Sequence, residues 1–301
     1  MRWVFFLCLL SFLTGCISEK EEIYVLYAGS LTQTTDALGR EFEREMETSY
    51  RGEGFGSIIC ARLIKEKLRE PDVFLSADFS VIDSEISDWF LTFASGEMVI
   101  AYNPKSKFSE EFSRKPWFEV LQNEGFRLGR TDPDLDPKGY RVLFVVKLAE
   151  IFYERELFEK ILGEERNPSQ IFRETELLVR LEVGQLNAVF AYKHEALERN
   201  LPFIQLPKEI NLASFKHSDF YKEVSYTLKG KTIYASPIIY VLTIPKTVRN
   251  KKSAIEFVKF ILEKKNLFFS NFGEIPILSG GDKDSIPLEL REYIVGDCCE
   301  V

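Results

Sequence analysis

Short apolar runs alternate with amphipathic stretches along most of the chain. Ile23–Tyr27 is rich in β-branched and aromatic residues and predicts a strand, and helical spacing of apolar residues follows it as far as Met46. A basic amphipathic helix is predicted at Ile58–Leu68, and further strands at Val73–Ser76 and Glu97–Tyr102. Strands that alternate with helices in this way favour parallel sheets with helices on both faces.

The second half of the chain repeats the alternation around a loop that contains two prolines. The expected elements are, in order, a helix at Lys115–Asn123, the loop Thr131–Gly139, helices at Tyr140–Tyr153 and Leu177–Glu182, strands at Ala188–Tyr192 and Ile238–Ile244, and a helix at Ala254–Leu267. The last helix has its apolar residues at the spacing of one buried face.

The order of these elements predicts two α/β lobes. Asn103-Pro104-Lys105 interrupts the pattern and is the expected first crossing between the lobes. Residues 23–102 would then form the first part of lobe I and residues 103–236 lobe II. Residues 237–301 would return to lobe I. In such sheets ligands bind beyond the carboxyl ends of the strands.

The first residues form a separate targeting segment. Arg2 precedes the apolar run Val4–Leu13, which is too short to span a bilayer, and Leu13-Thr14-Gly15-Cys16 places small residues before a cysteine. The pattern resembles a lipoprotein signal over residues 1–15, with a lipid on Cys16 and a tether at 16–22. The alternative is a plain secretory signal with an incidental cysteine; both predict export.

Composition excludes several other classes. Apolar residues make up 45% and charged residues 29%, as in ordinary globular proteins, and the net charge of −8 argues against nucleic acid as a partner. With two histidines and no C-x₂-C spacing, zinc and other cofactors are not expected. Cys60 lies in an apolar helical stretch and is expected to be buried.

Two glycine-serine segments precede predicted helices. Ala28-Gly29-Ser30 ends the first strand, and Gly52–Ser57 is predicted to be a glycine-rich turn before the helix at Ile58–Leu68. Ser30 and Ser57 could simply cap these helices. Together they could also supply two sets of donors to an oxyanion.

Acidic residues stand at two further helix starts. Asp132, Asp134 and Asp136 lie in the proline-containing loop, and Glu174 opens a helix within Arg173–Glu176. Turn formation and helix capping account for the first two aspartates. Asp136 is nearest the helix start and could point into a cleft, whereas a first-turn glutamate ordinarily serves the helix dipole.

An ordered set of short motifs, running from about residue 23 to about residue 290, resembles the archaeal tungstate/molybdate-binding proteins of ABC importers. The motifs are Tyr27-Ala28-Gly29-Ser30-Leu31, Gly56-Ser57, Ala77-Asp78-Phe79, Asp132-Pro133, Asp136-Pro137-Lys138-Gly139-Tyr140-Arg141, Glu174-Thr175-Glu176, Phe190-Ala191-Tyr192-Lys193 and Pro237-Ile238-Ile239-Tyr240. The resemblance implies a two-lobed periplasmic-binding-protein fold of type II, with a mixed sheet in each lobe. It further implies a monomeric, lipid-anchored receptor outside the cytoplasmic membrane, with an ABC permease as its partner and no enzymatic activity.

The resemblance also implies roles for individual residues. It places Ser30 and Ser57 on the oxygens of the oxyanion, Asp136 and Glu174 on the molybdenum or tungsten atom, and Tyr192 near the anion. This sequence departs from the family pattern at two places beside these residues. Lys138 stands where the family usually has cysteine, and the segment Leu162–Phe172 is shorter than usual.

Two carboxylates beside a dianion require a chemical reason, since at about 4 Å even a screened pair of like charges costs roughly 1–4 kcal/mol. Molybdenum(VI) and tungsten(VI) can accept two further oxygens, whereas sulfur(VI) and phosphorus(V) do so poorly. Coordination would therefore admit tungstate while repulsion rejects sulfate. The rival explanation is a protonated carboxyl group that donates a hydrogen bond.

Three other functions remain open on sequence grounds. The same scaffold could bind sulfate or phosphate, although acids at 136 and 174 disfavour this. An exported hydrolase could use Asp136 and Glu174 as an acid–base pair, but no nucleophile motif accompanies them. A receptor for Ca²⁺ could also use acidic residues in a cleft.

Overall fold

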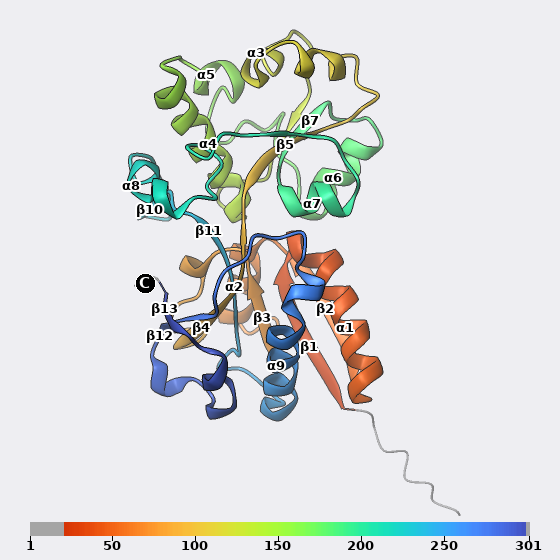
Figure 1. Ribbon diagram of the computed structural model, residues 1–301, viewed down its shortest axis with the longest axis vertical. Helices are drawn as coiled ribbons and strands as arrows, with labels where there is room; N and C mark the ends of the chain where they lie inside the picture. Colours follow the sequence, from red (N-terminus) through yellow and green to blue (C-terminus); the bar gives the residue numbers. More distant parts are fainter. Residues whose placement is uncertain (1–20, 299–301) are drawn as a thin grey trace, which may run out of the picture.

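The structure is a computed structural model that describes residues 21–298, and it consists of two lobes, one above the other in Figure 1. The first lobe contains a seven-stranded sheet in the order β13-β12-β4-β11-β3-β1-β2, and the second a four-stranded sheet in the order β6-β7-β5-β8. The strands of the large sheet are β1 (Glu22–Ala28), β2 (Ser49–Phe55), β3 (Val73–Ser76), β4 (Trp89–Gly96), β11 (Ile238–Thr243), β12 (Leu278–Gly281) and β13 (Gly296–Asp297). Those of the small sheet are β5 (Met98–Tyr102), β6 (Leu128–Gly129), β7 (Ala188–Tyr192) and β8 (Phe203–Gln205).

Helices cover both faces of the large sheet because its strands bury alternate residues on each side. On one face, α1 (Thr32–Met46) and α9 (Lys251–Phe268) pack together, with the rings of Phe42 and Phe257 edge-on at 5.0 Å. On the other face, α2 (Ser57–Lys65) buries Cys60 against the sheet, in a cluster that includes Phe74. The predicted burial of Cys60 is confirmed.

The second lobe is built around α4 (Pro137–Tyr153), whose side chains are buried along most of its length. It lies on one face of the small sheet, while α6 (Glu174–Glu182) contributes Leu177 and Leu181 to a cluster on the other face. The remaining elements of this lobe are α3 (Trp117–Val120), α5 (Phe158–Ile161), α7 (Lys193–Glu198), α8 (Ser218–Tyr221) and the hairpin of β9 (Ser225–Leu228) and β10 (Lys231–Tyr234).

The sheets are mixed, as the family resemblance implied, rather than parallel as the alternation alone suggested. In the large sheet β1 runs parallel to β2 and β3, but β11 pairs antiparallel with β3 and β4, and β12 antiparallel with β4. The antiparallel strands follow from the chain path, since β4 and β11 lie at the two crossings between the lobes.

The prediction of a turn at Gly52–Ser57 is wrong, because β2 continues to Phe55 and pairs with β1 along its whole length. The glycines serve packing here. A Cβ on Gly52 would lie 2.8 Å from the ring of Tyr27, and one on Gly54 would lie 2.7 Å from the same ring. The strand therefore uses the two glycines to admit an aromatic ring over its face.

The prediction of the first crossing at Asn103-Pro104-Lys105 is also wrong. β4 ends at Gly96 in the large sheet and β5 begins at Met98 in the small sheet, so the chain changes lobes at Glu97. Residues 98–102 thus belong to the second lobe, not the first. The predicted strand Glu97–Tyr102 corresponds to β5, and the apolar residues before it form a second strand, β4, that the sequence analysis did not predict.

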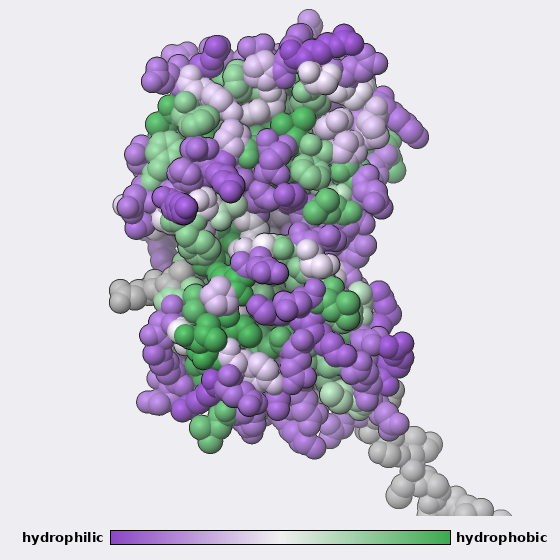
Figure 2. Space-filling view, viewed as in Figure 1, coloured by the Kyte–Doolittle hydropathy of each residue, from purple (hydrophilic) through white to green (hydrophobic). Residues whose placement is uncertain are grey.

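The predicted helix at Lys115–Asn123 is shorter, Trp117–Val120, and the helix expected from Tyr140 begins at Pro137. Proline suits a first helical position because its fixed φ matches the helix and its missing N–H has no partner to lose. In the view of Figure 2, hydrophilic residues surround the rim of both lobes, a narrower waist separates the lobes, and hydrophobic residues gather on the lower lobe just below the waist. Among residues 21–298, no helix has both the length and the apolar character that crossing a membrane would require. Cys16 lies outside the described residues.

Candidate functional site

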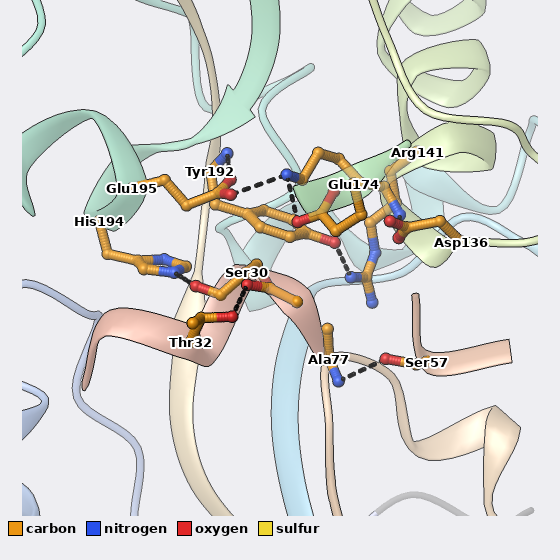
Figure 3. Close-up of polar contacts among 12 residues, drawn as sticks. Ser30, Thr32, Ser57, Ala77, Asp136, Arg141, Glu174, Tyr192, His194 and Glu195 are labelled. Atoms are coloured by element: carbon orange, nitrogen blue, oxygen red, sulfur yellow. Dashed lines mark hydrogen bonds and ion pairs between the residues drawn. The ribbon is translucent and has the colours of Figure 1, made fainter. Parts of the chain in front are cut away.

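The five residues predicted to bind an oxyanion meet between the lobes, each at or near the start of a helix (Figure 3). Ser30 lies in the short 3₁₀ turn Gly29–Leu31 before α1, and Ser57 is the first residue of α2. Asp136 is the N-cap of α4, Glu174 the first residue of α6, and Tyr192 the N-cap of α7. Helix N-termini carry partial positive charge and unpaired N–H groups, so this point of the molecule favours an anion.

The two lobes approach each other closely here because glycines face the acidic residues. A Cβ on Gly29 would lie 2.6 Å from Cγ of Glu174. A Cβ on Gly56 would lie 2.6 Å from the carbonyl oxygen of Leu135 and 3.1 Å from Cβ of Asp136. The structure thus has its lobes closed on the site, and only glycine fits at the point of contact.

Asp136 uses one carboxylate oxygen for its helix and leaves the other without a donor. Its Oδ1 accepts a 2.8 Å hydrogen bond from the backbone N–H of Lys138, the ordinary N-cap interaction. Its Oδ2 is buried and receives no hydrogen bond from an N–H or hydroxyl donor of the described residues, while the carboxyl group of Glu174 lies within hydrogen-bonding reach of the Asp136 carboxyl group. Burial, followed by the negative charge of Glu174, raises the pKa of Asp136 well above its usual range.

Glu174 has the same arrangement with a different donor. Its Oε1 accepts from the ammonium group of Lys138 at 2.8 Å, and its Oε2 is buried with no partner in the described part of the chain. Burial raises the pKa of this carboxyl group, against the lowering effect of Lys138. The same ammonium group donates to Oε1 of Glu195, also at 2.8 Å.

The two serines do not cap their helices. The N-cap residues of α1 and α2 are Leu31 and Gly56, and neither helix has a side-chain capping bond. The Ser57 hydroxyl accepts from the backbone N–H of Ala77 at 3.1 Å, which leaves its own hydrogen free to donate. The Ser30 hydroxyl makes no hydrogen bond within residues 21–298, so both hydroxyls are available to an oxyanion.

A neutral histidine fixes the backbone of the Ser30 turn across the lobe boundary. Nε2 of His194, in α7, lies 3.0 Å from the carbonyl oxygen of Ser30. Burial lowers the pKa of His194 to about 3, so the ring is neutral at physiological pH. Since the carbonyl can only accept, Nε2 carries the proton. The ring also stacks on Phe272 at 3.7 Å.

Tyr192 is linked to the opposite lobe through a buried arginine. The guanidinium of Arg141 donates to the Tyr192 hydroxyl at 2.6 Å and to Oδ2 of Asp78 at 2.8 Å. The hydroxyl of Tyr140 donates to the same Asp78 oxygen at 2.7 Å. Asp78 belongs to the first lobe and the other three residues to the second.

The sequence alone predicts no role for Lys138, Arg141, Asp78 or Glu195. Only Glu195 carried a local signal, since it stands three residues after the strand-ending Tyr192, the N3 position of a capping box. Its Oε2 accepts from the Tyr192 N–H at 2.9 Å, as that motif requires. The other three contacts join elements that are far apart in sequence.

The segment Leu162–Phe172 lies beside the site rather than in it. The fully buried Arg130 donates to the carbonyl oxygens of Glu164 and Glu165 at 2.8 and 2.7 Å. Arg166 pairs with Asp132 at 2.7 Å. These contacts hold the segment against the start of the Asp132–Asp136 loop.

The site combines converging helix N-termini, two free hydroxyl donors and two buried carboxylate oxygens without partners. An anion of ordinary tetrahedral chemistry would use the donors and be repelled by the carboxylates. An anion with an electron-accepting central atom would use both sets of groups.

Comparisons with known proteins point to one family. Residues 23–268 match the sequence profile of the bacterial extracellular solute-binding proteins. The molybdate/tungstate-binding protein WtpA of Pyrococcus abyssi is 34% identical over 301 aligned residues, which cover 86% of this chain and 88% of that protein. A Haloferax volcanii protein provisionally named as an ABC transporter molybdenum-binding protein is 36% identical over 248 residues, covering 80% and 79%. The resemblance inferred from the motifs is confirmed.

Among solved structures, the periplasmic molybdate-binding protein of Azotobacter vinelandii aligns with a TM-score of 0.60. The alignment covers 84% of this chain and 99% of that protein at 16% identity, and therefore concerns the fold alone. The predicted fold, two α/β lobes of the type II periplasmic-binding-protein class, is confirmed.

Proposed function

Since this chain belongs to the bacterial extracellular solute-binding proteins, we propose that it captures tungstate or molybdate outside the cytoplasm and delivers it to the permease of an ABC transporter. Its relatives are binding proteins rather than enzymes, which disfavours the hydrolase alternative. The ligand is proposed from the site, with the printed names of the two relatives as support.

One observation carries the choice of ligand. Asp136 Oδ2 and Glu174 Oε2 are buried without partners at a point where helix N-termini converge. A buried polar atom without a partner costs about 1–3 kcal/mol, so a native site that keeps two of them is built for something that binds there. In the proposed complex each oxygen donates to the metal atom, which passes from four to six oxygens, and Ser30 and Ser57 donate to the oxygens of the anion.

The charges around the carboxylates favour this ligand over the alternatives. Calcium would have to compete with the ammonium group of Lys138, which already lies 2.8 Å from both Glu174 and Glu195. Sulfate and phosphate would bring negative charge against two carboxylates, and their central atoms do not readily accept further oxygens. Tungstate and molybdate satisfy the carboxylates, the hydroxyls and the helix N-termini at once.

The proposal includes a membrane anchor. We expect cleavage before Cys16, a lipid on its sulfur, and residues 16–22 as a tether to the first described strand. A receptor held at the membrane surface would stay close to its permease.

Titration of the purified mature chain tests the ligand. Tungstate, molybdate, sulfate and calcium would be added separately while the intrinsic fluorescence and the heat of binding are followed. We expect tungstate and molybdate to bind saturably. Sulfate and calcium should not bind at the same concentrations. Tight binding of sulfate, or of calcium with no response to tungstate, would overturn the proposed ligand.

A further inference from the structure

We infer that Lys138 is a positioning residue that aims both metal-binding carboxylates, through its backbone at one and its ammonium group at the other. The inference rests on the proposed function and assigns a role to a residue for which the sequence alone predicted none. It is drawn from the contacts of four side chains between α4, α6 and α7.

Lys138 holds one oxygen of each carboxylate. Its backbone N–H binds Oδ1 of Asp136 at 2.8 Å, and its Nζ binds Oε1 of Glu174 at 2.8 Å. The oxygens that it leaves, Asp136 Oδ2 and Glu174 Oε2, are the buried ones without partners. One residue therefore determines which oxygen of each acid is presented to the ligand.

The ammonium group can do this because it is itself held in place. Lys138 is fully buried, and its Nζ also donates to Oε1 of Glu195 at 2.8 Å. The other oxygen of Glu195 accepts from the Tyr192 N–H, which ties it to the start of α7. Lysine loses much of its rotamer freedom in such a setting, so Glu174 receives a fixed donor rather than a mobile one.

The two halves of this role differ in how they depend on the side chain. Any residue other than proline at 138 keeps the backbone N–H for Asp136. Only the side chain reaches Glu174, with its Nζ 2.8 Å from Oε1. Replacing Lys138 should therefore disturb Glu174 and leave Asp136 in place.

The test is a pair of double-mutant cycles on tungstate binding, built from Lys138→Met, Glu174→Gln and Asp136→Asn. Loss of a residue that orients a metal ligand typically costs about 10–100-fold in affinity, and we expect that loss for Lys138→Met. The effects of Lys138→Met and Glu174→Gln should be strongly non-additive, because both remove the same metal–oxygen contact. The coupling between Lys138→Met and Asp136→Asn should be smaller, because the Lys138 substitution keeps the backbone N–H that binds Asp136.

Tungsten-edge X-ray absorption supplies a readout that a merely structural role would not change. The wild type should show six oxygens, and Lys138→Met should show five. Lys147→Met is the matched control, since it removes a lysine from the same helix and breaks a 3.0 Å pair with Glu165 at the surface. It should bind tungstate with wild-type affinity.

A charge-neutral variant separates position from charge and protects the test against misfolding. Lys138→Met with Glu195→Gln removes one positive and one negative charge, and leaves no charge of that pair buried alone. If Lys138 acts by position, this double variant should still bind weakly with five oxygens.

Wild-type affinity with six oxygens in either Lys138 variant would overturn the inference, as would additivity with Glu174→Gln. The proposed function would stand in that event. Failure of the wild type to bind tungstate would instead overturn the proposed function.

Discussion

Asp78 of the first lobe and Arg141 of the second form a buried ion pair, with the guanidinium nitrogen 2.8 Å from Oδ2 of the carboxylate. Their exposed fractions are only 6% and 3%. Arg141 also donates to the hydroxyl of Tyr192, a residue proposed to lie near the bound anion. The same side chain therefore joins the two lobes and orients a residue of the site. Closure of the lobes and assembly of the site are therefore physically linked.

Replacing Asp78 with Asn should shift the protein toward an open form. Removing one partner of a buried pair costs about 3–5 kcal/mol, and here the cost falls on the closed form, because opening returns Arg141 to water. Apparent affinity falls with the fraction of closed-competent molecules, so tungstate binding should weaken at least tenfold. Small-angle scattering should show a larger radius of gyration at subsaturating tungstate than in the wild type.

Asp83→Asn is the matched control for this prediction. Asp83 lies in the same lobe and pairs with Lys65 at the surface, where ion pairs contribute little. If Asp78→Asn and the wild type bind tungstate with equal affinity, and tungstate reduces their radii of gyration equally, the ion pair does not govern closure.

Gly56→Ala should obstruct closure by a different route. The added Cβ would lie 2.6 Å from the backbone carbonyl oxygen of Leu135, and backbone cannot move aside as a side chain can. We expect weaker tungstate binding with little loss of thermal stability, since the clash exists only between closed lobes. Gly296→Ala, whose Cβ would meet only Leu278 at 3.4 Å, should bind as the wild type does. Unchanged affinity in Gly56→Ala would mean that ligand binds without this approach.

Asp136→Asn and Glu174→Gln distinguish coordination from hydrogen bonding. If the carboxylates bind the metal, an amide oxygen is a poorer donor and each variant should lose about tenfold or more in tungstate affinity, while sulfate binding stays the same or improves. If a protonated carboxyl merely donates a hydrogen bond, the amides can replace it and affinity should hardly change. X-ray absorption on the wild-type complex decides between six oxygens and four.

Local sequence patterns predicted those elements whose boundaries carry a local signal. The strands Val73–Ser76 and Ala188–Tyr192 are observed with the predicted bounds, since each is a short apolar run with polar residues beyond it. The stretch from Trp89 to Tyr102 is apolar almost throughout and contains two strands of different sheets. Only Gly96-Glu97 marks the change of lobe, and no periodicity distinguishes the strand before it from the strand after.

The site divides in the same way. Ser30, Ser57, Asp136 and Glu174 lie at or near helix starts, as their local sequence predicts, whereas only the family resemblance implied a place for Tyr192; the structure brings all five together. The pairing of Lys138 with Glu174 and Glu195 depends on how three helices of the second lobe are arranged, and the Asp78–Arg141 pair on how the two lobes meet. Neither spacing nor composition encodes those arrangements.

Cys16→Ser tests export and anchoring. If Cys16 carries lipid, the wild type should fractionate with membranes, and the serine variant should appear in the soluble fraction outside the cytoplasm. A single acyl chain anchors only marginally, so stable attachment implies more than one chain. Equal amounts of both forms in the soluble fraction would contradict lipidation and favour a plain secretory signal.

Glu198 should make the closed protein sensitive to pH. Its Oε1 accepts from the Thr34 hydroxyl at 2.5 Å, which joins α7 of the second lobe to α1 of the first. Burial raises the pKa of Glu198 from 4.5 to about 7, although the hydrogen bond from Thr34 opposes the rise. Between these values the unfolded chain has released the proton while the folded one retains it.

Stability should therefore fall as pH rises from about 4.5 to about 7 and then level off as far as this group is concerned. The loss is at most about 3 kcal/mol, reduced by the solvent that still reaches the carboxyl group. Glu198→Gln keeps an oxygen for Thr34 and cannot ionise, so it should match the wild type near pH 4 and be more stable at pH 8. Thermal unfolding of both proteins across this range is the measurement. If the stabilities of the two proteins instead differ by the same amount at every pH, Glu198 is already ionised in the folded protein at low pH. Its contact with Thr34 across the lobes would then be that of a carboxylate throughout the range.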